Sequence, residues 1–412
     1  MKLLLLLLAF SIGALYGAGN AAEVLAKACR VGDLKTAEAL LSLGIDPDQV
    51  DQYRKSPLYY AASFNETRAV ALLLAHHANP NSGSLPLQAA AELGNSRIAD
   101  MLLAAGAQIN AKAPTGRTAL HVAVTANHLD LIRLLIEKGA SVNVRDVEGT
   151  SPLDDAVWRG YLEAAAVLLA KGARLNEAET RTGATPINEA AYRGQTELVQ
   201  YLLQFHPDLG IPDRRGYTPL ENAIRQGKTD SALLLLGAEP KAQKTPQFLA
   251  KMMGASIHKD DAVVVDALLR HGALANGRLA SGATPLDAAA TAGASKVVSV
   301  LLKHGADPNT ECRNGNSPLE DASLRGFNPI VGMLLDHGAL VNQVNSGSGT
   351  TALYAAASFG KGDVVNLLLE RGADPNICGT GERSAYKAAL ENGYSEIAAQ
   401  IQLHGGSRTC KP

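Results

Sequence analysis

The chain has 412 residues and a formal net charge of -2, so it carries no overall attraction for nucleic acid or anionic lipid. Its length exceeds what one core usually organises, which leaves several domains or one repeat array. Hydrophobic residues make up 46% of the chain but aromatic residues only 4%. A core dominated by alanine and leucine favours closely packed short helices over sheets.

Residues 1–21 have the order of a secretory signal peptide. Lys2 precedes an almost uninterrupted apolar stretch from Leu3 to Leu15, and small residues follow up to Ala21. The stretch is shorter than the ~20 residues of a spanning helix, which makes an uncleaved membrane anchor the less favoured alternative. We therefore expect an exported protein, periplasmic in a bacterium and otherwise secreted, monomeric, and without an integral membrane segment once the signal is removed.

Between residues 22 and 406 one pattern recurs, mostly at intervals of 33 or 34 residues. Each copy starts with Ser or Thr, then Pro or Ala, then Leu or a similar residue. Ser and Thr can cap a helix, and the first turn of a helix tolerates Pro. Glycine usually follows nine and twenty-one residues later, where it permits a tight turn and a left-handed helix end. The copies start at Ser56, Thr118, Ser151, Thr185, Thr218, Thr284, Ser317, Thr351 and Ser384, with a weaker copy at Leu85.

The stretch from Thr118 to Ala123 reads Thr-Ala-Leu-His-Val-Ala. It resembles the T-P-L-H-x-A signature of the ankyrin repeat, whose unit has 33 residues. The resemblance to the ankyrin repeat family extends over nearly the whole chain after the signal. It implies an all-α fold, an ankyrin-repeat solenoid of about twelve helix-turn-helix units joined by β-hairpin loops.

One unit, residues 237–283, breaks the register. Counting from Thr245, the second glycine comes six residues late, so we expect an insertion between the two helices, near residues 255–261. A rival alignment starts the unit at Lys251 and keeps the spacing, but it loses the Thr-Pro start. Residues 407–412 form a C-terminal tail.

The sequence contains no catalytic constellation, no cofactor motif and no metal-ligand spacing, so we expect no catalytic residue, no cofactor and no metal. Five histidines occupy one position near the end of the second helix, where an imidazole favours the helix dipole. They are His76, His271, His304, His337 and His404.

The chain has four cysteines, and an oxidising compartment would permit a disulfide. Cys378 and Cys410 occupy nearly equivalent places in the last unit but one and in the tail, which could fold back, so we predict a bridge between them. The alternative is four free thiols. Cys29 stands where other units have a small buried residue, and we interpret it as a packed free thiol.

In the ankyrin family, hairpin tips and the last turn of each first helix line a concave groove. The resemblance therefore implies a partner-binding site where Trp, Tyr and Arg, the residues enriched at binding hot spots, gather on adjacent units. The predicted residues are Trp158, Arg159, Tyr192, Arg193, Arg214, Arg215, Tyr217 and Arg225. In one alternative the arginines only pair with local acids and the aromatics pack between units; in another the site lies elsewhere, such as the irregular unit.

The function implied by the resemblance is a non-enzymatic protein–protein interaction module outside the cytoplasm. It would bind a partner protein and act as its scaffold, adaptor or inhibitor. We expect no binding to nucleic acid. The alternative is a structural, envelope-associated protein without a discrete ligand. An enzyme is the least favoured class, because the repeat pattern accounts for the histidines and no catalytic motif remains.

Overall fold

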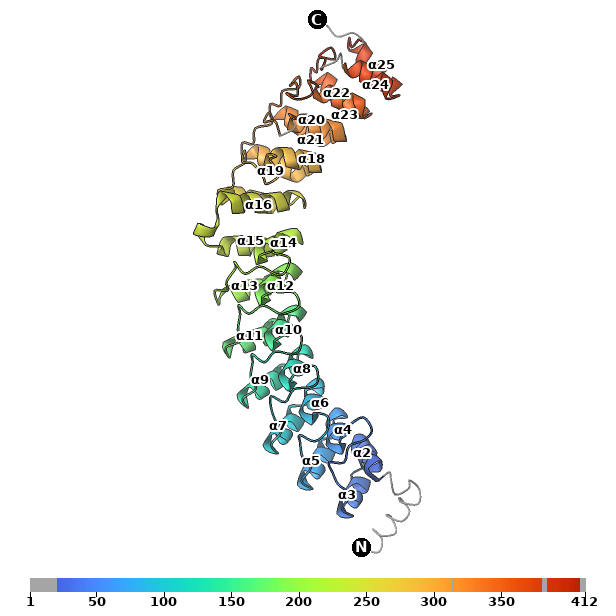
Figure 1. Cartoon of the computed structure of the whole chain (residues 1–412), viewed down its shortest axis with the longest axis vertical. Coiled ribbons are helices and arrows are strands. Elements are labelled where there is room, and N and C mark those ends of the chain that lie inside the picture. Colours follow the sequence, from blue (N-terminus) through green and yellow to red (C-terminus); the bar gives the residue numbers. More distant parts are fainter. Residues whose placement is uncertain (1–20, 313–314, 380–383, 408–412) are drawn as a thin grey trace. The chain divides into compact units, whose positions relative to one another are not determined.

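The computed structural model describes residues 21–312, 315–379 and 384–407 (Figure 1). These residues form 24 α-helices and one short 3-10 helix, and they contain no strand. The chain divides into two units. Unit 1 contains the described residues up to 190 together with 204–216, and unit 2 contains 191–203 and the described residues from 217 onward.

Unit 1 is a stack of helix pairs that follow one another in chain order (Figure 1). The first helix of each pair packs on the first helix of the next pair, and second helices pack on second helices. The helices are α2 (Ala21–Val31), α3 (Leu34–Ser42), α4 (Pro57–Ser63), α5 (Thr67–Ala75), α6 (Pro86–Leu93), α7 (Ser96–Ala104), α8 (Ala119–Thr125), α9 (Leu129–Glu137), α10 (Pro152–Arg159) and α11 (Leu162–Ala170). The division between the units falls within α12 (Pro186–Arg193).

Unit 2 repeats the same stacking. Its elements are α13 (Thr196–Leu203), α14 (Pro219–Arg225), α15 (Thr229–Ala238), η1 (Lys241–Gln243), α16 (Pro246–Ile257), α17 (Ala262–Arg270), α18 (Pro285–Ala292), α19 (Ser295–Lys303), α20 (Pro318–Arg325), α21 (Asn328–Asp336), α22 (Ala352–Ser358), α23 (Gly362–Glu370), α24 (Ala385–Glu391) and α25 (Ser395–Leu403).

The recurring Ser or Thr caps the first helix of its pair, as predicted. Ser56, for example, accepts a hydrogen bond from the Tyr59 backbone N–H at 3.2 Å. The five predicted histidines are all C-cap residues of second helices. Leu85, the weak copy, offers no side-chain cap.

In both compact units the core lies between the stacked helices. Small residues such as Ala61 and Ala90 are fully buried in first helices, and leucines such as Leu102 and Leu135 are fully buried in second helices. Small side chains let neighbouring helices approach closely, and the leucines fill the space between layers.

The connections between pairs are tight turns without strands in the described part of the chain. The Ala113 N–H donates to the Arg117 carbonyl at 2.9 Å, and the Gly116 N–H donates to the Ala113 carbonyl at 2.7 Å. The turn before α10 has the same two bonds: the Asp146 N–H donates to the Thr150 carbonyl, and the Gly149 N–H donates to the Asp146 carbonyl. The predicted hairpins are therefore present as hydrogen-bonded turns.

The irregular unit differs from the expected loop insertion. Helix α16 begins after Thr245, whose side chain accepts from the Phe248 N–H at 3.2 Å, and it runs for 12 residues, against seven or eight in the other first helices of unit 2. Gly254 lies inside this helix and is not among the glycines of positive φ. The extra residues mainly lengthen a helix, because Leu249, Met252 and Ile257 keep a helical spacing of buried positions.

Cys29 and Cys312 are free thiols, and burial raises the pKa of Cys29 to about 12, which agrees with a packed free thiol. Cys378 is disulfide-bonded. Its predicted partner Cys410 lies outside the described residues, as does the predicted signal up to residue 20, so the pairing and the signal stay predictions. Within the described residues, no helix has the length and apolar character to cross a membrane.

Candidate functional site

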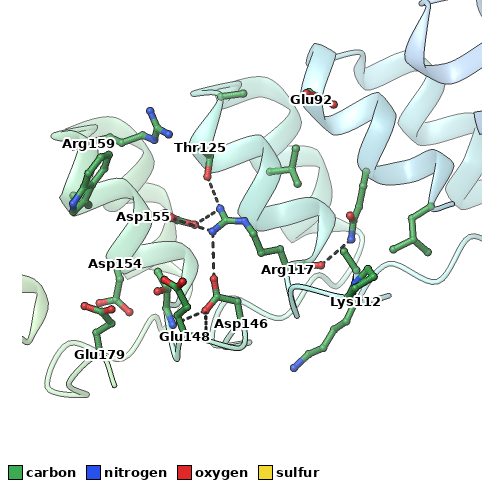
Figure 2. Close-up of a pocket in the computed structure, with 18 of the residues that line it drawn as sticks. Glu92, Lys112, Arg117, Thr125, Asp146, Glu148, Asp154, Asp155, Arg159 and Glu179 are labelled. Atoms are coloured by element: carbon green, nitrogen blue, oxygen red, sulfur yellow. Dashed lines mark hydrogen bonds and ion pairs between the residues drawn. The ribbon is translucent and has the colours of Figure 1, made fainter. Parts of the chain in front are cut away.

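A groove of about 1220 Å³ runs over unit 1 (Figure 2). Its wall is built from the first helices α4, α6, α8 and α10, from the start of α12, and from the turns that precede them. The groove extends over successive layers because each first helix packs on the next one. Side chains at equivalent positions of successive repeats therefore form one continuous surface.

Arg117 occupies the centre of this groove, in the turn before α8. Figure 2 shows its guanidinium pointing between Asp155, Asp146 and Thr125. Nη2 lies 2.6 Å from Asp155 Oδ2 and donates to Thr125 Oγ1 at 2.6 Å, and Nη1 lies 3.3 Å from Asp146 Oδ2. The Arg117 side chain is only 25% exposed. Such a paired, half-buried arginine fixes the shape of the groove floor.

The acids beside Arg117 are perturbed by burial. Burial raises the pKa of Asp155, and the charge and hydrogen bonds of Arg117 oppose that rise. Burial also raises the pKa of Asp154 to about 6, although its carboxylate accepts from the Ser151 N–H at 2.8 Å. Since Asp154 is held in a capping box at the start of α10, we assign it a structural role.

Exposed aromatic side chains also line the groove. Trp158 near the end of α10 is 47% exposed, and Tyr53 before α4 is 67% exposed. The Arg159 guanidinium lies 5.4 Å from the Trp158 ring centroid, which is a cation–π distance. Large aromatic side chains left in water beside a groove are candidate anchors for a partner.

Two of the eight predicted partner-binding residues, Trp158 and Arg159, line this groove. Of the others in unit 1, Arg214 is exposed and Arg215 pairs with buried Asp213 at 2.7 Å. In unit 2, Arg225 lies 4.3 Å from the Tyr217 ring and 3.6 Å from Glu221, while Tyr192 is half-buried and Arg193 exposed in α12. In the structure, the predicted residues Arg215 and Arg225 thus form ion pairs with acids of the same compact unit.

Sequence reasoning missed Arg117, Asp146 and Tyr53. It considered hairpin tips as well, but it selected the repeats in which Trp, Tyr and Arg gather, and these three residues lie in the turns before α8, α10 and α4. Because turn composition varies between repeats, a single sequence gives little signal for such contacts. The groove contains no group of three described His, Cys, Asp or Glu side chains placed to hold a metal.

The comparison with protein families accounts for this architecture. A family model for three copies of the ankyrin repeat matches residues 25–113, 112–179, 174–247, 234–312, 252–345 and 306–378. The chain belongs to the ankyrin repeat family. Ankyrin repeats indicate a protein–protein interaction module, and the family fold is typically non-enzymatic.

The chain is also similar to two individual proteins. Over 109 residues the chain is 33% identical to glycerophosphocholine phosphodiesterase gde1 of Schizosaccharomyces pombe, covering 25% of this chain and 10% of that enzyme. The chain therefore spans a tenth of the length of this relative. The solved ankyrin repeat domain of Bcl-3 is similar with 29% identity and a TM-score of 0.45, covering 48% of this chain and 93% of that one.

Proposed function

We propose that this ankyrin repeat protein is a non-enzymatic binding module that holds a segment of a partner protein in the groove of unit 1. The observation that carries the proposal is the groove itself, whose lining includes the exposed Trp158 and Tyr53 as well as Arg117, which is already paired. Its volume of about 1220 Å³ exceeds the roughly 300–1,000 Å³ of small-molecule pockets, which favours a polypeptide ligand.

The chemistry of the lining favours a partner segment with apolar side chains and charges of both signs. Besides Arg117 and the acids that pair with it, the lining carries acids such as Glu92 and Glu148 and bases such as Arg54 and Lys112. Charged side chains of a partner would meet these groups at the rim, while apolar ones would pack on the aromatic rings.

The site of action that we propose is outside the cytoplasm. This proposal rests on the signal-like order of residues 1–21. Scaffold, adaptor and inhibitor roles all begin with the same binding event. The groove supports that event without distinguishing among the three roles.

Substitution at the groove tests the proposal. Trp158→Ala and Tyr53→Ala should each weaken capture of a partner from the native compartment by about 2 kcal/mol, roughly 30-fold, because they remove aromatic anchors. Leu340→Ala is the matched control, since Leu340 is equally exposed but lies in unit 2. Trp158 is the single tryptophan, so the purified partner should also shift the intrinsic fluorescence.

Two outcomes would contradict the proposed groove. If Trp158→Ala and Tyr53→Ala both capture the partner as the wild type does, the groove is not the binding site. If instead Arg193→Ala or Arg215→Ala weakens capture while Trp158→Ala does not, the binding surface lies with the other sequence-predicted residues.

A further inference from the structure

Three metal-type donors from separate segments of unit 2 converge on one place. They are Asp287 in the first turn of α18, Cys312 in the turn before α20, and Asp321 in α20. One carboxylate oxygen of each aspartate and the Cys312 sulfur all lie within 4.8 Å of one another. The stacking of α18 on α20 brings the two helices to this distance.

Asp287 differs from its equivalent in another repeat. Asp154, three residues after its own N-cap, turns back and accepts from the Ser151 N–H at 2.8 Å and from Ser151 Oγ at 2.7 Å. Asp287 holds the same position after Thr284, but among the described residues its Oδ1 is buried without a hydrogen-bond partner. Asp287 is only 4% exposed. A buried carboxylate oxygen without a partner is costly, and a cation would remove that cost.

The other two donors are held by their neighbours. Asn316 Nδ2 donates to Asp321 Oδ1 at 2.7 Å. The turn that carries Cys312 is closed by a bond from its N–H to the Asn316 carbonyl at 2.9 Å. Cys312 is a free, half-buried thiol, so its sulfur is available as a ligand.

No basic side chain among the described residues neutralises Asp287, so a cation could take that role. Burial raises the pKa of Asp287 to about 7, a side-chain hydrogen bond with Asp321 and the charge of that carboxylate add to the rise, and Arg278 opposes it. Arg278 donates instead to the Gly282 and Glu311 carbonyls at 2.9 and 3.2 Å. Among the described residues, no hydrogen bond or ion pair joins Arg278 to Asp287.

We propose that Asp287, Cys312 and Asp321 bind a zinc-type divalent cation, with water as the fourth ligand. A thiolate beside carboxylates suits Zn²⁺ or Co²⁺ and disfavours Mg²⁺ and Ca²⁺, which prefer oxygen alone. Tetrahedral zinc would hold these donors about 3.5 Å apart, so donor atoms that lie within 4.8 Å of one another need to close by little more than about 1 Å at most. Cys312 releases its proton as it binds.

This site lies beyond the protein-binding role and departs from the sequence-based expectation of no metal. The bound cation would join two adjacent repeats through their first helices. Its stabilisation of unit 2 would then depend on metal concentration.

Titration of the metal-free full chain tests the proposal. The wild type should bind one Co²⁺ with a near-ultraviolet charge-transfer band from thiolate to metal. Cys312→Ser should abolish that band, and both Cys312→Ser and Asp321→Asn should weaken Zn²⁺ binding at least about tenfold. Asp336→Asn, which changes an exposed acid elsewhere in unit 2, should bind as the wild type does. A band that survives Cys312→Ser, or no uptake of one equivalent, would overturn the site.

A second measurement needs no variant. Zn²⁺ should protect Cys312 of the folded wild type from alkylation, as read by mass spectrometry of its peptide. Alkylation at the same rate with and without Zn²⁺ would refute ligation by Cys312 even if a substituted chain fails to fold.

Discussion

A buried histidine joins a helix cap to the next turn in unit 1. His121 Nδ1 lies 3.2 Å from the Thr118 backbone nitrogen and 2.9 Å from Thr118 Oγ1, and Nε2 lies 3.2 Å from the Thr150 carbonyl oxygen. The ring is fully buried, and burial lowers the pKa of His121 to about 4. His121 is the histidine of the family signature, and the capping box gives it a structural role.

The lowered pKa predicts that unit 1 is destabilised by acid. The unfolded chain takes up a proton near pH 6.5 and the folded chain only near pH 4, so His121 should cost up to about 3 kcal/mol as pH falls through this window. Asp154, whose pKa is raised, acts in the opposite direction, so the comparison needs a variant. Relative to the wild type, His121→Gln should lose less stability between pH 7 and pH 4.5 in urea unfolding. Equal losses would show that His121 is not responsible.

At the scale of the element, sequence predicted what local chemistry dictates. Ser and Thr caps, mid-unit glycines and C-cap histidines act within a few residues, so their positions could be predicted. The long helix α16 could not, because Gly254 looks like a mid-unit turn in sequence although it lies within helix. The buried spacing of Leu249, Met252 and Ile257 is the signal that favours helix there.

The turn after α6 provides a test of helix spacing. Gly94 has a φ of 70°, and a Cβ atom there would lie 2.5 Å from the His128 ring. Gly106, in the same repeat, has a φ of 93° and nothing within 4 Å of such an atom. Gly106→Ala should therefore cost only the backbone penalty of about 1–2 kcal/mol, and Gly94→Ala should cost about 1–3 kcal/mol more through overpacking.

Urea unfolding followed by circular dichroism measures both losses. Adding His128→Ala to Gly94→Ala should recover the difference between the two glycine variants, because it removes the ring that the new methyl group meets. Equal losses for Gly94→Ala and Gly106→Ala would mean that the backbone conformation alone matters.

At the scale of the whole molecule, the sequence predicted the repeat array better than the candidate site. A repeated capping signal is visible many times in one chain. By contrast, the groove depends on which side chains meet across layers: Arg117 reaches Asp155 over 38 positions, and Asp287 meets Asp321 from the next repeat. Such contacts have no short sequence spacing, which is why both the groove floor and the donor cluster escaped prediction.

Contacts between neighbouring layers also determine how a local change spreads. In the described helices of unit 1, α8 packs on α6, α9 and α10, and stability in such an array is close to a sum of repeat and interface contributions. Arg117→Ala leaves Asp155 and Asp146 as poorly exposed carboxylates without their arginine. We expect the opening free energy of α8 and α10 to fall by about 2 kcal/mol, which speeds amide hydrogen exchange there roughly 30-fold. Helices α20 and α22 of unit 2 should exchange as before.

Lys138→Ala is the matched control for this prediction. Lys138 lies 2.6 Å from Asp100 in the same unit, but both side chains are well exposed, so the loss of that ion pair should change exchange little. Mass spectrometry of peptides from the three proteins separates the cases. Faster exchange spread evenly over both units in Arg117→Ala would contradict a nearest-neighbour array. The same small effect in both variants would show that Arg117 contributes no more than an exposed lysine.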